Sequence, residues 1–131
     1  MSLPALFISH GSPMLAIEDS PARRFLLDLG RTLPRPKAIL VASAHWESFG
    51  RPAVSLAPHP ETIHGFGGFA AALYDIEYPA PGAPDAAARA ADSLEQAGFA
   101  VKRSAARGLD HGGTKSAVDI SVPAPFSRAS A

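Results

Sequence analysis

Histidines follow two apolar runs of this sequence, at positions where side chains often do chemistry. The run "LFIS" at residues 6–9 leads into His10, and the run "ILVAS" at residues 39–43 leads through Ala44 into His45. If both runs are neighbouring parallel strands, their carboxyl ends lie about 5 Å apart, at the edge where open α/β sheets bind ligands. Two imidazoles at that spacing can share one metal ion. The pattern is compatible with a metal site, although loop histidines that only cap the sheet explain the spacing more simply.

Two carboxylates could complete such a site. Glu47 lies two residues after His45, on the same side of an extended chain, and Glu18 precedes a predicted helix. A set of two histidines and one carboxylate is typical of non-haem Fe(II) oxygenases. A solvated strand end explains Glu47 more simply, however, and the helix dipole alone favours an acid at Glu18.

The other histidines lie in turns rich in glycine or proline. His64 belongs to "ETIHGFGGF", where the glycines are equally consistent with close approach of a substrate and with a plain turn. His111 follows Asp110, a carboxylate that could orient an imidazole, although a histidine in such a loop is usually only a loop residue. His59 stands between two prolines and is interpreted as exposed and structural.

Composition and motifs exclude several classes of function. The chain has no cysteine, so disulfides, thiolate metal sites and cysteine nucleophiles are excluded. Its 12 basic and 12 acidic residues cancel, and no field favours nucleic acid or an anionic membrane. "DHGGT" resembles the oxyanion-hole motif of esterases, but no G-x-S-x-G follows it. The N-terminus has neither a basic leader nor a long apolar run, so no signal peptide or membrane span is expected and a cytoplasmic location is predicted.

The elements that must position the histidines are predicted to form an α/β fold. Residues 3–9 and 37–43 are interpreted as two buried strands, because a continuous apolar run suits a strand covered on both faces. Between them, Ser20 as N-cap, Pro21 and the terminal Gly30 predict a helix with the apolar Phe25, Leu26 and Leu29 on one face. Strand, helix and strand in this order predict a parallel pair joined by a crossover.

The second half of the chain is predicted to continue this pattern. We expect a strand at 53–56, a short helix near 69–74, a helix over 84–97 and a strand at 99–103, followed by a loop at 106–113. The 84–97 helix should pack through Ala87, Ala90, Ala91 and Leu94. Residues 113–131 are rich in Ser, Ala and Pro and are interpreted as a tail. The fold class is thus a mostly parallel sheet flanked by helices.

Five motifs in order over residues 3–112 give the sequence a family resemblance. It resembles the class III extradiol ring-cleavage dioxygenases, in particular the 4,5-DOPA dioxygenase-like branch, through "LFISHGSPM", "ILVASAHWE", "PETIHGFGGF", "ALYDIEYPAPGAP" and "GLDHG". The resemblance implies an enzyme that opens a catechol-type ring with O2. It also implies Fe(II) as the cofactor, with Zn as the other metal found in some members.

The resemblance also implies roles for individual residues. His10 and His45 match metal ligands of the family, and His111 matches a pocket histidine that is a candidate acid/base or substrate-orienting group. His64 matches another pocket residue. Gly65 stands where family members often have an aspartate, so this chain lacks an acidic group there.

The sequence departs from the family pattern after residue 112. Family members continue with further elements and with a histidine, in an "SGNVVHN"-like motif, that completes the metal site, and the tail does not match them. We therefore expect residues 1–112 to be the N-terminal half of such a domain, incomplete relative to the family, in a truncated or frameshifted and weakly active or inactive chain. The alternatives are a non-catalytic fragment that acts by association, with self-association through an exposed sheet edge, and a metal-dependent hydrolase-like relative.

Overall fold

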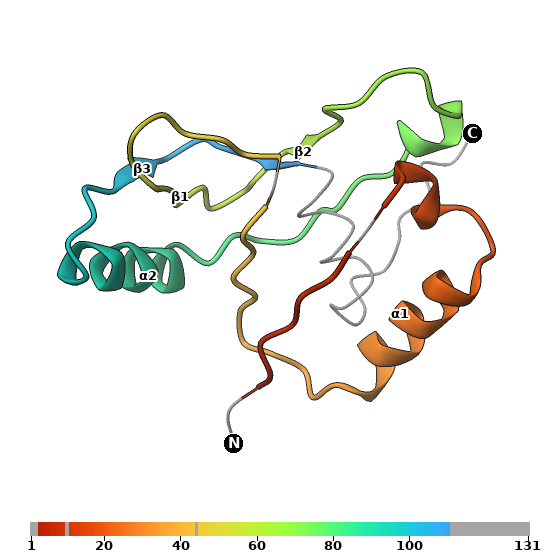
Figure 1. Cartoon of the computed structure of the whole chain (residues 1–131), viewed down its shortest axis with the longest axis horizontal. Helices are drawn as coiled ribbons and strands as arrows, with labels where there is room; N and C mark the ends of the chain where they lie inside the picture. Colours follow the sequence, from red (N-terminus) through yellow and green to blue (C-terminus); the bar gives the residue numbers. More distant parts are fainter. Residues whose placement is uncertain (1–2, 10, 44, 111–131) are drawn as a thin grey trace.

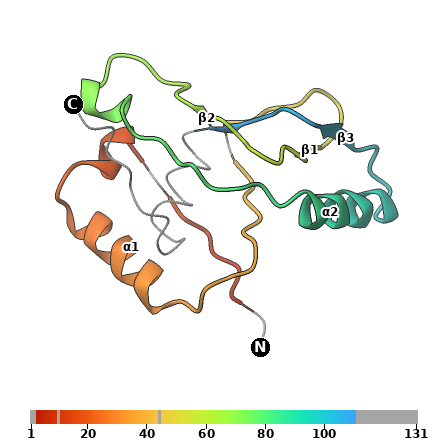
Figure 2. The same ribbon diagram turned by 180° about the vertical axis from the view of Figure 1, so that it is seen from behind.

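The computed structural model describes residues 3–9, 11–43 and 45–110 of the chain. Figure 1 shows its helices and strands joined by long connections, with α2 beside β1 and β3 at one end and α1 at the other, and Figure 2 shows the same arrangement from behind. The elements, in chain order, are η1 (Pro13–Ala16), α1 (Pro21–Thr32), β1 (Ala53–Ser55), β2 (Thr62–Ile63), η2 (Ala71–Leu73), α2 (Pro84–Gln96), β3 (Lys102–Ser104) and β4 (Leu109–Asp110).

Helix α1 begins where its sequence predicts. The Ser20 side chain accepts a hydrogen bond from the backbone N–H of Arg23 at 3.1 Å, and Pro21 occupies the first turn. The helix continues to Thr32, beyond the expected stop at Gly30. On the apolar face that the sequence predicts, Leu26 is buried, whereas Phe25 is 65% exposed.

Parallel strand pairs confirm the predicted fold class as a partial α/β fold. Strand β1 pairs with β3 with Val54 opposite Arg103, and β2 pairs with β4 with Ile63 opposite Asp110. The connection from β1 to β3 contains α2, which packs on β1. The predicted strand at 53–56 and helix at 84–97 are therefore confirmed, and Ala91, on the expected face of α2, is fully buried.

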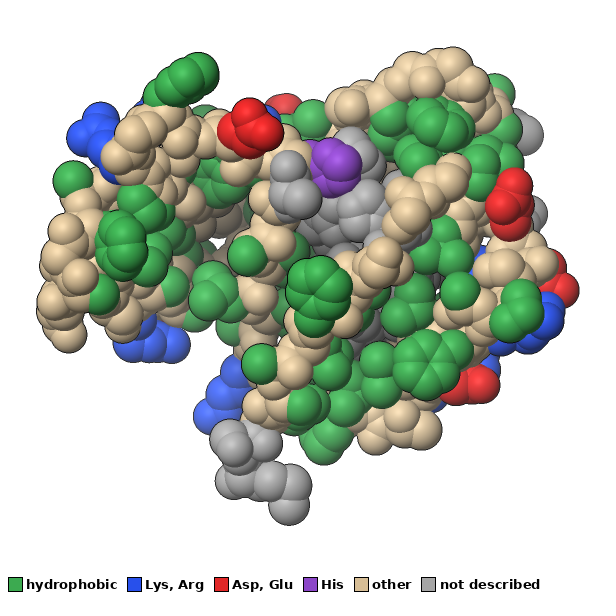
Figure 3. All heavy atoms as spheres, in the orientation of Figure 1, with side chains coloured by type: hydrophobic (Ala, Val, Ile, Leu, Met, Phe, Trp, Pro, Cys, Tyr) green, Lys and Arg blue, Asp and Glu red, His purple; other side chains and the backbone are tan. Residues whose placement is uncertain are grey.

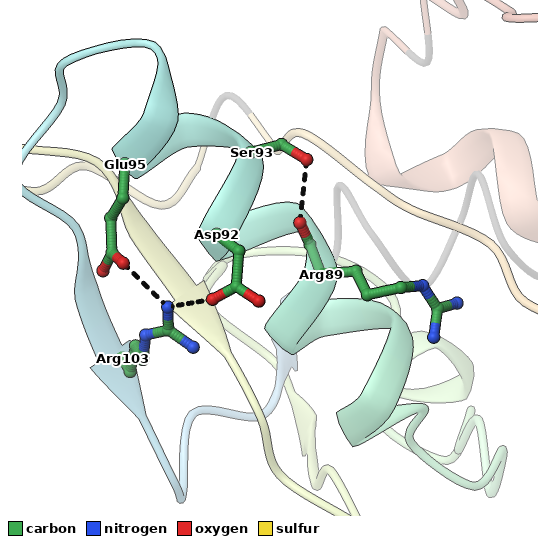
Figure 4. Close-up of polar contacts among 5 residues, drawn as sticks. All are labelled: Arg89, Asp92, Ser93, Glu95 and Arg103. Atoms are coloured by element: carbon green, nitrogen blue, oxygen red, sulfur yellow. Dashed lines mark hydrogen bonds and ion pairs between the residues drawn. The ribbon is translucent and has the colours of Figure 1, made fainter.

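An arginine ties β3 to α2 on the surface. Arg103 donates from one guanidinium nitrogen to Asp92 at 2.6 Å and to Glu95 at 3.0 Å (Figure 4). The hydrogen bond to Asp92, and then that to Glu95, raises the pKa of the Arg103 guanidinium, which favours its charged form. Because Asp92 and Glu95 lie one turn apart on α2, the arginine fixes the end of the helix against the strand.

The two apolar runs at 3–9 and 37–43 do not form the predicted strands. Neither segment belongs to a sheet, and most of their residues are exposed, including Phe7 at 99% and Leu40 at 77%. The predicted parallel pair with its crossover through α1 is therefore wrong for this structure. An apolar run becomes a strand only where a neighbour accepts its backbone hydrogen bonds, and within the described residues no such neighbour lies beside either segment.

The second half departs from the prediction in smaller ways. The expected strand at 99–103 is shifted to Lys102–Ser104, and the expected helix near 69–74 is the short turn η2. The loop predicted over 106–113 contains β4, and β2 was not foreseen at all. The tail at 113–131 lies outside the described residues. None of the helices in the described part of the chain is long and apolar enough to cross a membrane.

The buried core of the described residues is small. Its hydrophobic members with the least exposure are Leu26, Ala57, Leu73 and Ala91. Beside Ala57 the chain passes very close to itself, because Gly82 donates its N–H to the carbonyl of Pro58 at 2.9 Å. A Cβ atom at Gly82 would lie 1.9 Å from the Ala57 carbonyl oxygen, so only glycine fits there.

Candidate functional site

The carboxyl ends of β2 and β4 lie side by side and lead toward two of the candidate histidines. Parallel pairing places Ile63 opposite Asp110, and His64 is the next residue after β2. The strands approach closely because β4 follows a glycine: a Cβ atom at Gly108 would lie 2.3 Å from the Glu61 carbonyl oxygen. That oxygen accepts a hydrogen bond from Leu109 N–H at 2.7 Å. This close approach therefore places the carboxyl end of β4 beside the carboxyl end of β2, which His64 follows.

His64 is held by a backbone carbonyl and by aromatic rings. Its Nε2 lies 2.8 Å from the carbonyl oxygen of Ile76, which can only accept, so Nε2 is the protonated nitrogen. The ring meets Phe66 edge-on at 5.9 Å and Tyr74 at 6.1 Å between centroids. With Nε2 engaged, Nδ1 is the ring atom that can accept a proton. His64 thus has a fixed tautomer and a fixed plane.

Strand β2 also anchors the segment that carries this carbonyl. The Thr62 side chain accepts a hydrogen bond from the N–H of Tyr78 at 2.9 Å. Two hydrogen bonds, one at Thr62 and one at His64, therefore hold residues 76–78 beside β2. The "TIH" and "DIEY" motifs, separate in sequence, form one local unit.

A serine joins the His45 segment to the end of β4. Ser43 donates its hydroxyl to Asp110 Oδ1 at 2.6 Å, although the two residues are 67 positions apart. The same hydroxyl oxygen accepts a hydrogen bond from the backbone N–H of His45 at 3.1 Å. Asp110 is 6% exposed, and it is the buried charged side chain among the residues that the structure describes. His45 itself is an exposed residue.

An arginine forms the second connection between the same two segments. Arg107 donates to Asp110 Oδ2 at 3.3 Å, and its guanidinium carbon lies 5.2 Å from the centroid of the Trp46 ring. This distance is that of a cation–π contact. Sequence reasoning missed Ser43, Arg107 and Trp46 as members of the site. The carboxylate before His111 was the available signal, since buried aspartates are almost always paired.

The structure places only part of the predicted metal site. His45 is among the described residues, whereas His10 and His111 lie outside them. Glu47, Glu18 and His59 are exposed, as expected for solvated or structural positions. Within residues 3–9, 11–43 and 45–110, no group of three His, Asp or Glu side chains is arranged to hold a metal ion. Imidazole and water are nonetheless donors that both Fe(II) and Zn accept.

Comparison with known proteins identifies a family. The family described as the catalytic LigB subunit of aromatic ring-opening dioxygenase matches residues 4–115 of the chain. The match therefore includes the segments of His45 and His64 as well as the β2–β4 pair.

Individual relatives agree with this family. The 4,5-DOPA dioxygenase extradiol of Escherichia coli (strain K12) is 49% identical over 110 residues, which are 84% of this chain and 40% of that protein. The protein of the same name from Beta vulgaris is 48% identical over 110 residues, with 81% and 41% covered. That from Portulaca grandiflora is 42% identical over 111 residues, with 82% and 41% covered. The chain thus spans about two fifths of the length of these relatives.

Proposed function

Because the chain belongs to the family of the catalytic LigB subunit of aromatic ring-opening dioxygenases, we propose that it carries part of an extradiol dioxygenase site for catechol-type substrates and O2. The observation that supports this most is the convergence at Asp110. Strand pairing brings His64 beside it, the Ser43 hydrogen bond brings the His45 segment to it, and His111 follows it in sequence. The segments of His45 and His64 therefore meet at one end of the β2–β4 pair, and His111 is the next residue after that end in the sequence.

His10 and His45 are the proposed metal ligands, with Fe(II) as the expected ion and Zn as the alternative. A bound Fe(II) would supply the redox chemistry with O2 that no side chain of this chain provides. His45 suits the role because it lies on the surface with its backbone N–H fixed by Ser43. Such outer contacts orient ligating imidazoles in metal sites generally.

His64 and His111 are the proposed groups that orient the catechol and move its protons. His64 can take up a proton only at Nδ1, because Nε2 donates to the Ile76 carbonyl. A general base must lie within hydrogen-bond reach of the proton that it removes, and the contact of Nε2 leaves Nδ1 as the atom for that role. His111 would act from the adjacent strand end.

The division of the chain and its activity are also proposals. We place residues 1–112 in the N-terminal part of the dioxygenase domain and residues 113–131 outside it, in a cytoplasmic protein. Two imidazoles hold Fe(II) more weakly than a set of three ligands does. Because the described residues contain no group of three His, Asp or Glu side chains that could hold a metal ion, we expect these 131 residues by themselves to bind Fe(II) weakly and to turn over slowly or not at all.

Anaerobic Fe(II) titration of the purified chain tests the proposal, followed by O2 uptake with a simple catechol. We expect weak Fe(II) binding that His45→Ala reduces by about tenfold or more. His59→Ala is the matched control, because His59 is exposed and lies outside the convergence at Asp110. Equal Fe(II) affinity in the His45→Ala variant and the wild type would contradict the assignment. Rapid ring cleavage by this chain alone would contradict the proposed weak activity.

One feature favours a second function, association without catalysis. Large hydrophobic side chains are exposed in the N-terminal segment, in α1 and in residues 37–43, namely Leu3, Leu6, Phe7, Phe25, Ile39 and Leu40. Figure 3 shows hydrophobic side chains gathered on the face that these elements form. Exposed apolar runs of this kind are sites of association and aggregation. No described carboxylate completes a three-residue metal group, so nothing comparable favours the hydrolase-like alternative.

Light scattering at increasing concentration tests the association. We expect the chain to self-associate, and we expect the double substitution of Phe7 and Leu40 by Asp to reduce this. Phe49→Asp is the control, because Phe49 is fully exposed but belongs to neither apolar run. A monomeric chain at high concentration would remove the second function.

A further inference from the structure

Asp110 is engaged through both of its carboxylate oxygens. Oδ1 accepts from the Ser43 hydroxyl at 2.6 Å, and Oδ2 accepts from Arg107 Nη2 at 3.3 Å. The carboxylate is 6% exposed, so these are hydrogen bonds to a charged group in a place that water reaches poorly. Bonds of this kind are about twice as strong as neutral ones. Asp110 therefore connects Ser43 with Arg107 and is not a solvated surface charge.

Ser43, the partner of Oδ1, links Asp110 to the backbone of His45. An ionised carboxylate only accepts, so the Ser43 hydroxyl must donate its single proton to Asp110. Its lone pairs are then turned toward the chain that follows, where the N–H of His45 donates to it at 3.1 Å. Asp110, Ser43 and the His45 backbone thus form one directed chain of hydrogen bonds. The direction depends on residue 110 being an acceptor.

Arg107, the partner of Oδ2, contacts Trp46, the residue after His45. Arg107 is held by Asp110 and lies over the Trp46 ring, with 5.2 Å from the guanidinium carbon to the centroid. The Arg107 side chain is 28% exposed, so the contact is largely shielded from water, where a cation–π contact is strongest. The backbone of His45 is consequently fixed on both sides, at Ser43 and at Trp46.

We infer that Asp110 is a positioning residue that clamps Ser43–Trp46 to residues 107–110, so that His45 and the chain entering His111 are presented as one rigid unit. What the positioned histidines do rests on the proposed function, but the clamp does not. It is defined by four side chains, those of Ser43, Trp46, Arg107 and Asp110, and it joins segments more than 60 residues apart.

Two signals in the metal-free full chain report on the clamp directly. Trp46 is the single tryptophan of the sequence, so fluorescence quenching by acrylamide measures the exposure of that ring alone. Amide hydrogen exchange of His45, followed by NMR, measures the bond to Ser43 Oγ. We expect Asp110→Asn to increase both the quenching constant and the exchange rate. The exchange rate should rise about fivefold, which corresponds to one ordinary hydrogen bond.

Further variants separate the two arms. Ser43→Ala removes the first arm but keeps the buried ion pair, so it should raise His45 exchange even if Asp110→Asn fails to fold. Arg107→Lys keeps the charge but loses the planar group, so it should raise Trp46 quenching and leave His45 exchange nearly unchanged. Asp28→Asn is the control, since Asp28 forms an exposed ion pair with Arg31 on α1.

The outcomes distinguish the clamp from the proposed enzyme. Wild-type His45 exchange in Ser43→Ala, or wild-type Trp46 quenching in Arg107→Lys, would overturn the clamp. Neither signal depends on metal or on ring cleavage, so a chain that binds no Fe(II) would refute the proposed function and leave the clamp standing. If Zn²⁺ does bind, its affinity should fall about tenfold or more in Ser43→Ala, as for other outer contacts of ligating histidines. Unchanged affinity would overturn the positioning role.

Discussion

Gly108→Ala should push β4 away from β2 and so disrupt the candidate site at the carboxyl ends of these two strands. The added Cβ would lie 2.3 Å from the Glu61 carbonyl oxygen, whereas ordinary contact begins at 3.4 Å, so the two segments must move apart by about 1 Å. Both partners are backbone atoms or are fixed to the backbone, and neither can rotate away. Gly108 does not have a positive φ, so the effect is steric and not one of backbone strain.

The expected cost follows from three contributions. Forcing a methyl group into a filled space costs about 1–3 kcal/mol. Loss of the hydrogen bond from Leu109 N–H to Glu61 costs about 1 kcal/mol. Alanine also stabilises the folded state by about 0.5 kcal/mol, because it lowers the conformational entropy of the unfolded chain. The free energy of unfolding should therefore fall by about 1.5–3.5 kcal/mol, a large part of the stability of a small domain.

Urea denaturation followed by Trp46 fluorescence measures this change. Gly67→Ala is the matched control, because no atom lies within 4 Å of a Cβ at Gly67 and its φ is also not positive. That variant should be neutral or slightly more stable. A Gly108→Ala variant within about 0.5 kcal/mol of the wild type would show that β2 and β4 are not packed as described.

Further substitutions test the elements that surround the site. Ser20→Ala removes the N-cap of α1 and should lower the free energy of unfolding by about 1 kcal/mol in urea denaturation, whereas Ser12→Ala, at the shorter η1, should cost less. Ala91→Leu overfills the contact of α2 with β1 and should cost about 1–3 kcal/mol, and the exposed Ala71→Leu serves as its control; equal stability of the two would contradict the packing of α2. His64→Gln keeps a donor for the Ile76 carbonyl but no basic nitrogen, so circular dichroism should show an intact fold while any ring cleavage supported by added Fe(II) is lost; retained cleavage would remove His64 as the base.

Local signals in the sequence were sufficient to predict the helices. Ser20 followed by Pro21 marks the start of α1, and Pro84 with the alanine-rich face around Ala91 marks α2, because caps and 3.6-residue periodicity depend on neighbours in the chain. The two helices and the α/β fold class are confirmed. The parallel pairs that form are β1–β3 and β2–β4, however, and not the pair at 3–9 and 37–43 from which parallel strands were predicted.

Strands were predicted less well because they depend on distant partners. The runs at 3–9 and 37–43 have the composition of buried strands, but backbone pairing is not encoded in a run of apolar residues, and neither run pairs in the described structure. Strands β2 and β4 have two residues each, too few to show any period. The sequence signal for these two strands is Gly108, because the absence of a side chain there permits its close approach to Glu61.

The candidate site shows the same limit. Motif resemblance pointed to His45 and His64, and the carboxylate at Asp110 was noted as a group that could orient an imidazole. The Ser43–Asp110 bond spans 67 positions, and Arg107 meets Trp46 across a similar interval, so no local pattern could have paired them. Their alignment results from β4 lying beside β2, which is a property of the fold.

X-ray absorption spectroscopy of the chain loaded with Zn²⁺ under metal-limiting conditions tests the central claim most directly. The claim is that His45 is a metal ligand in a site shared with His10. The spectrum of the wild type should show two imidazole nitrogens at about 2.0–2.1 Å from the metal, and that of His45→Ala should show one. A spectrum with only oxygen donors, or one that is the same for His45→Ala as for the wild type, would contradict the account.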